Sequence, residues 1–119
     1  MYGNDGDDSI QGNDGNDKIR GNDGDDNLVG GVGEDILFGG NDNDILIGGV
    51  DDDELWGDKG DDNLDGGEGI DILYGGKGHD VLYGGPGDDL LIGDTGNNSI
   101  NGGSGSDTLM VFKNQNSRR

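Results

Sequence analysis

The chain has 119 residues, with 27 acidic and 7 basic side chains and a formal net charge of −20. So acidic a chain, without a basic stripe, does not favour nucleic-acid binding, and no apolar run approaches the length of a membrane span. Only 27% of the residues are hydrophobic, so composition alone indicates disorder rather than a globular domain with a large core.

A nine-residue pattern repeats twelve times, without insertion or deletion, from Gly3 to Met110. Its register is Gly, Gly/Asn/Asp, x, Gly/Asp, x, Asp, x, Leu/Ile, x, and we number these positions one to nine. All 29 glycines fall at positions one, two or four. A fixed short period of this kind is typical of a solenoid rather than a globular domain.

Each repeat predicts one turn and one short strand. Positions one to six predict a tight turn with positive φ angles, because Gly, Asn and Asp tolerate that region best. Positions seven to nine predict a three-residue strand whose middle residue, always Ile or Leu, points inward. In chain order these strands are residues 9–11, 18–20, 27–29, 36–38, 45–47, 54–56, 63–65, 72–74, 81–83, 90–92, 99–101 and 108–110.

The pattern GGxGxDxUx, in which U is a large aliphatic residue, resembles the RTX (repeats-in-toxin) family of hemolysin-type calcium-binding repeats. The resemblance covers residues 3–110, and we expect one module over residues 1–119 with a tail at 111–119. It implies an all-β fold, a right-handed parallel β-roll (β-solenoid). Two repeats would form one coil of 18 residues, with successive strands alternating between two sheets of short strands. It also implies calcium as the cofactor and export from a bacterial-type cell.

Stacking of alternate repeats would align the position-six side chains in two files, which the resemblance implies as calcium ligands. The odd-numbered repeats would contribute Asp8, Asp26, Asp44, Asp62, Asp80 and Asn98. The even-numbered repeats would contribute Asp17, Asp35, Asp53, Asp71, Asp89 and Asp107. Each file has five gaps between neighbouring coils, so we expect at most about ten Ca²⁺ ions, which would offset the formal charge of −20.

The resemblance also implies backbone carbonyl ligands, from positions two and four of one turn and positions one and three of the turn 18 residues later. Such hard oxygens suit Ca²⁺. Because Asn98 is neutral, we expect the site between Asp80 and Asn98 to be the weakest with two full turns. The expected carbonyl ligands are Gly31, Gly33, Gly40, Asp42, Gly48, Gly49, Val50, Asp51, Gly57, Asp58, Lys59, Gly60, Gly66, Gly67, Glu68, Gly69, Gly75, Gly76, Lys77, Gly78, Gly84, Gly85, Pro86 and Gly87.

Folding is expected to depend on the ions. Burial of the twelve position-eight side chains contributes about 1.5–3 kcal/mol each, whereas ordering the backbone costs at least about 1 kcal/mol per residue. The calcium-free chain should therefore be disordered and calcium should fold it. Since ligand carboxylates must be ionised to bind metal, we also expect acid to unfold the chain.

One outward face is unusually apolar. On the even-repeat face, position nine carries Arg20 followed by large apolar residues, and position seven adds three more. These residues either form ladders that stabilise the sheet or make a docking face, and we favour docking. Self-association would use either this face or the roll ends, where unpaired strands are templates for further pairing. The expected interface residues are Ile36, Phe38, Trp56, Ile72, Tyr74, Leu90, Ile92 and Met110.

Motifs of catalysis are missing. The chain contains no HExxH, no complete GxSxG and no EF-hand loop, so we expect no enzymatic activity. The single histidine, His79, lies at the variable position five and is expected to face solvent.

We interpret the chain as a calcium-binding structural, folding or interaction module of a secreted protein. Two alternatives stay open: an accessory secretion or stability domain of an exported enzyme or toxin, and a carbohydrate-binding module that uses Trp56 and Tyr74.

Overall fold

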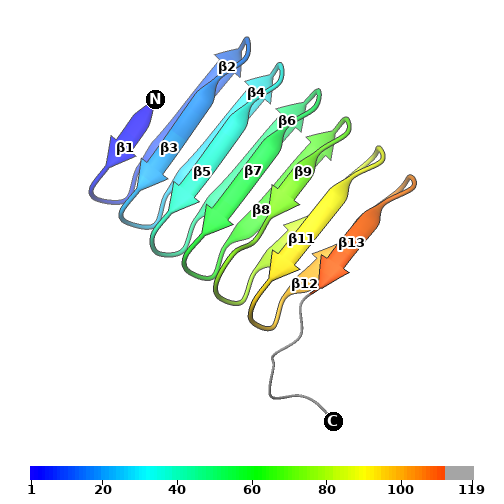
Figure 1. Ribbon diagram of the computed structural model, residues 1–119. Coiled ribbons are helices and arrows are strands. Elements are labelled where there is room, and N and C mark those ends of the chain that lie inside the picture. The colour runs from blue at the N-terminus through cyan, green and yellow to red at the C-terminus, as the bar shows by residue number, and fades with distance from the viewer. Residues whose placement is uncertain (112–119) are drawn as a thin grey trace.

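The computed structural model of the protein describes residues 1–111, so most of the expected tail at 111–119 lies outside the described residues. Figure 1 shows a roll in which the chain passes alternately between two sheets. The strands of the described residues are β1 (Tyr2–Asn4), β2 (Ser9–Asp14), β3 (Lys18–Asn22), β4 (Asn27–Val32), β5 (Ile36–Gly40), β6 (Ile45–Val50), β7 (Glu54–Asp58), β8 (Asn63–Glu68), β9 (Ile72–Tyr74), β10 (Val81–Tyr83), β11 (Leu90–Asp94), β12 (Ser99–Asn101) and β13 (Thr108–Val111). Residues 1–111 contain no helix with the length and apolar character needed to cross a membrane.

The two sheets are parallel and separate the odd strands from the even strands. One sheet has the order β1-β3-β5-β7-β9-β11-β13, and the other has the order β12-β10-β8-β6-β4-β2. Paired strand residues lie 18 positions apart, as Leu37 and Leu55 or Leu28 and Leu46 do, except that the register shifts in the last pair and Asp94 lies beside Val111. The predicted all-β solenoid with 18-residue coils is therefore confirmed.

The core is a double row of the position-eight side chains. Nine of them, from Ile19 to Leu91, are at most 2% exposed, and Ile10 and Ile100 pack against this cluster. Leu109, in β13, is 45% exposed because no further described coil covers it. The core is therefore thin, since one aliphatic side chain per nine residues supplies nearly all of it.

Most strands are longer than the three residues that the repeat predicts, whereas β9, β10 and β12 have that length. β2, β4, β6 and β8 each run for six residues, from position seven of one repeat to position three of the next. Within residues 1–111, positive φ angles occur only at positions two and four, and the seven Asn and Asp residues there share them. The position-one glycines have none, and most of them continue the strand, so a six-residue turn beginning at position one is wrong for those repeats; Gly75, Gly84 and Gly102 do follow the predicted three-residue strands β9, β10 and β12.

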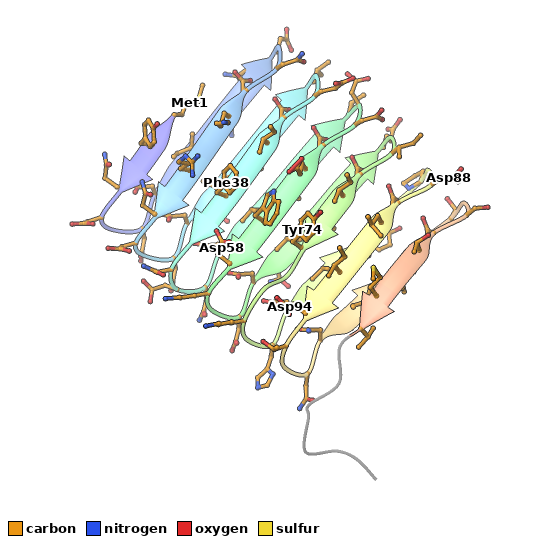
Figure 2. The ribbon with its side chains drawn as sticks, viewed as in Figure 1. Met1, Phe38, Asp58, Tyr74, Asp88 and Asp94 are labelled. Atoms are coloured by element: carbon orange, nitrogen blue, oxygen red, sulfur yellow. The ribbon has the colours of Figure 1, made fainter. Side chains whose placement is uncertain are left out.

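On the outer face of the seven-stranded sheet, the position-nine side chains stack on one another. The guanidinium carbon of Arg20 lies 4.4 Å from the ring centroid of Phe38, and the Phe38 and Trp56 centroids are 6.0 Å apart. Trp56 and Tyr74 stack more closely, with centroids 3.9 Å apart and an interplanar angle of 18°. Figure 2 shows Phe38 and Tyr74 on this common face. The rings therefore turn their faces toward each other, which is the ladder arrangement that stabilises neighbouring strands.

Candidate metal centres

The position-six carboxylates lie buried at the two corners of the roll, where the chain turns from one sheet to the other. Eight of them, from Asp26 to Asp89, are at most 3% exposed. The Oδ1 atom of each accepts a hydrogen bond from the position-six N–H of the preceding coil. Asp53, for example, accepts from Asp35 N at 2.9 Å, and Asp62 accepts from Asp44 N at 2.7 Å. This bond orients each carboxylate and aligns the two files.

The second oxygen of these carboxylates has no donor. Among the described residues, Oδ2 is buried without a hydrogen-bond partner at Asp8, Asp17, Asp26, Asp35, Asp44, Asp53, Asp62, Asp71, Asp80 and Asp89. A buried oxygen of an ionised carboxylate is costly unless it meets a donor or a cation. Ten such atoms in equivalent places form a repeated set of buried oxygens whose charge a cation would balance.

The position-one glycine borders this space. A Cβ placed on Gly30 would lie 2.5 Å from Asp35 Oδ2 and 2.7 Å from the carbonyl oxygen of Gly48. A Cβ on Gly57 would likewise lie 2.6 Å from Asp62 Oδ2 and 2.7 Å from Gly75 O. Two oxygens from neighbouring coils thus face the same small volume, and any side chain at position one would fill it. This crowding explains why position one is glycine in all twelve repeats without a positive φ.

Asn98 reveals which other oxygens face the same place. Its Nδ2, in the position that Oδ2 takes elsewhere, lies 3.4 Å from both Asp94 O and Thr95 O, to which it donates. The carbonyls of the turn therefore point toward the terminal atom of the position-six side chain. Where that atom is a carboxylate oxygen, it would repel the carbonyl oxygens that face it, and a cation bound between them would remove this repulsion. Hard oxygens from a carboxylate and several carbonyls are the donor set that Ca²⁺ prefers, so the residues fit this ion.

Side chains alone do not form the sites. No group of three or more His, Cys, Asp or Glu side chains comes together within residues 1–111. Backbone carbonyls must therefore complete any coordination shell.

The expected carbonyl ligands differ in what they contact in the structure. Those at position one, such as Gly48 O and Gly75 O, border the space beside Oδ2. Several at positions two and three hold the coils together instead. Gly40 O accepts from Lys59 N at 3.0 Å, and Val50 O accepts from Gly33 N at 3.2 Å. A carbonyl retains a second lone pair, so these oxygens can still serve an ion, and their role as ligands stays a prediction.

The two non-glycine residues at position four are accommodated by their own side chains. Asp42 and Asp51 have φ angles of 75° and 86°. Their carboxylates accept N–H bonds from the preceding coil, Asp42 from Gly24 at 2.9 Å and Asp51 from Gly33 at 3.0 Å. The loss of glycine's freedom is therefore offset by an added bond between coils.

Burial changes the acidity of the position-six carboxyls. Desolvation is the largest cause, and it raises their pKa values, while the N–H bond to Oδ1 opposes it. Neighbouring acids in the same corner raise the pKa values further. The pKa rises to about 7 at Asp44 and Asp53, to about 8 at Asp62 and Asp71, and to about 6 at Asp80. Without a metal ion, the carboxyls at the centre of each file therefore remain partly protonated near neutral pH.

Comparison with known proteins agrees with this geometry. A family model described as RTX calcium-binding nonapeptide repeat (4 copies) matches residues 2–37, 38–73, 56–91, 65–99 and 74–109. The comparison with curated proteins finds no match. The family matches span almost all of the described chain, and they contain both files of buried carboxylates. The chain belongs to the RTX calcium-binding nonapeptide repeat family and is a calcium-binding repeat module.

Proposed function

We propose that calcium folds this module and that the folded roll serves as a structural or interaction part of a secreted protein. The observation that carries the proposal is the set of ten buried Oδ2 atoms without a donor. In a calcium-free roll, each of them is either protonated or an unpaired buried charge. An ion in each gap between coils supplies the missing positive charge and joins one coil to the next.

The number of ions follows from the stacking. The two files of position-six side chains have five gaps each, which gives up to about ten Ca²⁺ ions between the described coils. Ten such ions offset the formal charge of −20. Each interior carboxylate borders two gaps, and the terminal ones border a single gap, so the sites are coupled along each file. Asn98 weakens its gap with Asp80, because its amide nitrogen occupies the place of a carboxylate oxygen.

Interior ligands should therefore matter more than terminal ones. We expect Asp62→Asn to raise the calcium concentration at the folding midpoint several-fold more than Asp107→Asn. Both substitutions can keep the Oδ1 bonds to Asp44 N and Asp89 N, so they differ mainly in the number of gaps affected. Calcium titration followed by circular dichroism measures the two midpoints. Equal shifts, or a larger one for Asp107→Asn, would contradict sites shared between coils.

The accessory role in an exported enzyme or toxin is compatible with this function, because a calcium-folded roll stabilises whatever it is attached to. The carbohydrate-binding alternative has less support. Trp56 and Tyr74 stack face to face, which leaves ring edges rather than ring faces for a sugar. The buried, periodic acids support a binding role rather than a catalytic one.

We also propose that the folded roll self-associates through its ends. Seven of the eight expected interface residues on the even-repeat face are half-buried by their neighbours, and only Met110 is exposed, at 41%. The edge strand β13 exposes Leu109, Met110 and Val111, by 45%, 41% and 55%. The apolar surface that remains open is thus richer at this edge than on the face. Within residues 1–111, β13 is the last strand of its sheet, and an edge strand offers backbone groups to a second copy.

Sedimentation velocity tests this proposal. Species larger than a monomer are expected in calcium and absent in chelator. Leu109→Asp should reduce them at least several-fold, whereas Ile47→Asp, at a similarly exposed site in the middle of the other sheet, should leave them unchanged. Circular dichroism in calcium verifies that both variants fold. A monomer at high concentration in calcium would show that the roll does not self-associate.

A further inference from the structure

A second ladder of hydrogen bonds joins the coils at position five, one residue before the buried carboxylates. Asp7 Oδ1 accepts from Asp25 N at 2.8 Å, while Asp26 Oδ1 accepts from Asp8 N at 2.8 Å. The position-five bond therefore runs from the later coil to the earlier one, and the position-six bond runs the other way. Together they make a reciprocal pair that joins residues 7–8 to residues 25–26.

The ladder is continuous at the corner formed by the turns of the odd repeats, which we call the odd corner. All five steps between described coils carry the position-five bond, with lengths of 2.8–3.0 Å. The acceptors are Asp7, Asp25, Asn43, Asp61 and His79. His79 is exposed, as expected, but its Nδ1 also accepts from Asn97 N at 3.0 Å. These side chains share one feature: an acceptor atom bonded directly to Cγ.

The corner formed by the turns of the even repeats, the even corner, has two interruptions. Asn16, Asp52 and Asp88 accept the bond from the next coil, and Figure 2 marks Asp88 at this corner. Within residues 1–111, no such bond joins Glu34 to Asp52 N or Ile70 to Asp88 N. Ile70 has no polar atom, and the acceptor of Glu34 lies one bond further from the backbone. Every step at the even corner nevertheless keeps its position-six bond.

We infer that position five holds the positioning residues of the calcium sites. Positions five and six are joined by one peptide group, so a bond that fixes position five also fixes the direction of the carboxylate that follows. The position-five side chains are exposed, and those that accept a bond reach the N–H of the next coil, so they act through the backbone rather than on the ion. The even-corner steps at Glu34 and Ile70 therefore hold their carboxylates, Asp35 with Asp53 and Asp71 with Asp89, less firmly than the other steps.

The inference rests on the proposed function for its effect on calcium, but the bond itself can be tested separately. Ile70→Asn supplies the missing acceptor without adding charge, in the form that Asn43 already uses toward Asp61 N. Ile70→Ala removes the same apolar side chain and supplies no acceptor. In saturating calcium, hydrogen exchange at the Asp88 amide should be about fivefold slower in Ile70→Asn than in Ile70→Ala, the factor expected for one more hydrogen bond. The calcium midpoint of Ile70→Asn should also be the lower of the two.

The reverse change tests the intact corner. Asn43→Ala should speed exchange at the Asp61 amide about fivefold, and Asn43→Asp should restore the wild-type rate because it keeps the acceptor on Cγ. Asn27→Ala, at the exposed strand position seven, is the matched control and should leave the Asp61 amide unchanged. Fast exchange in Asn43→Ala together with wild-type exchange in Asn43→Asp distinguishes positioning through this bond from a general effect on stability.

The outcomes separate the two ideas. If wild-type protein gains no order with calcium, the proposed function fails. If it folds with calcium but Asp88 exchanges equally fast in Ile70→Asn and Ile70→Ala, the inference about position five is overturned. Should Ile70→Asn fail to fold, Glu34→Asn against Glu34→Ala applies the same comparison to the Asp52 amide. Slower exchange without a lower calcium midpoint would reject the positioning role while leaving the bond in place.

Discussion

In excess chelator at about pH 8, the chain is expected to lose nearly all of its β-sheet circular dichroism signal, and millimolar Ca²⁺ should restore it in one cooperative step. The pKa of Asp62 rises from 3.8 to about 8 in the calcium-free roll. At about 1.4 kcal/mol per pKa unit, ionising this one carboxylate costs the calcium-free fold on the order of 5 kcal/mol at such a pH. Burial raises the pKa values of the other interior position-six carboxyls, from Asp26 to Asp89, in the same direction, so each of them opposes calcium-free folding at this pH.

Calcium makes folding favourable, because each ion pairs with buried ionised carboxylates and joins one coil to the next. Mg²⁺ is the control: it demands regular octahedral geometry and keeps its waters, so it should not fold the chain at equal concentration. A β-sheet signal in chelator that equals the signal in calcium would show that folding does not require the ion. A gradual, non-cooperative titration would show that the ions bind independently.

Acid should affect the calcium-free and calcium-loaded chains in opposite directions. Burial raises the pKa values of the position-six carboxyls in the calcium-free roll above their value of 3.8 in an unfolded chain. A raised pKa in the folded state contributes stability that is fully present below the unfolded pKa and is lost as pH rises through the folded pKa. For Asp44 and Asp53 the loss occurs between about pH 4 and 7, and for Asp62 and Asp71 between about pH 4 and 8.

In chelator, the chain is therefore expected to show more β-structure at about pH 4 than at about pH 8, with a free energy of unfolding larger by several kcal/mol. In calcium, acid instead protonates the ligands and releases the ions, so the added stability from calcium disappears. Urea titrations at both pH values, with and without calcium, measure the four stabilities. If the calcium-free chain were less folded at about pH 4 than at about pH 8, the buried carboxyls would not be the groups that oppose folding. The expectation that acid unfolds the chain thus applies to the calcium-loaded roll.

The nine-residue period, together with the family resemblance that it carries, predicted the architecture and the position of the acids. Two repeats make one coil, so a residue meets the residue 18 positions later whatever the side chains are, as Leu28 meets Leu46. Asp at position six consequently forms files, and Ile or Leu at position eight forms the core. Positive φ at Asn22 or Asp58 was also predictable, because Gly, Asn and Asp are the residues that adopt it readily.

Only the tertiary structure showed which contacts the side chain at each repeat position makes with the neighbouring coils. Position one looked like a turn glycine, but Gly30 continues a strand and is small because Asp35 Oδ2 and Gly48 O occupy the space around it. Position five looked variable, but a Cγ-bonded acceptor there meets an N–H of the next coil, as His79 does with Asn97. The apolar column on the even face was predicted as a docking surface, and the structure adds that Trp56 and Tyr74 stack on each other within it. In each case the deciding contact is made by a neighbouring coil, at a distance and an angle that the order of residues along the chain does not contain.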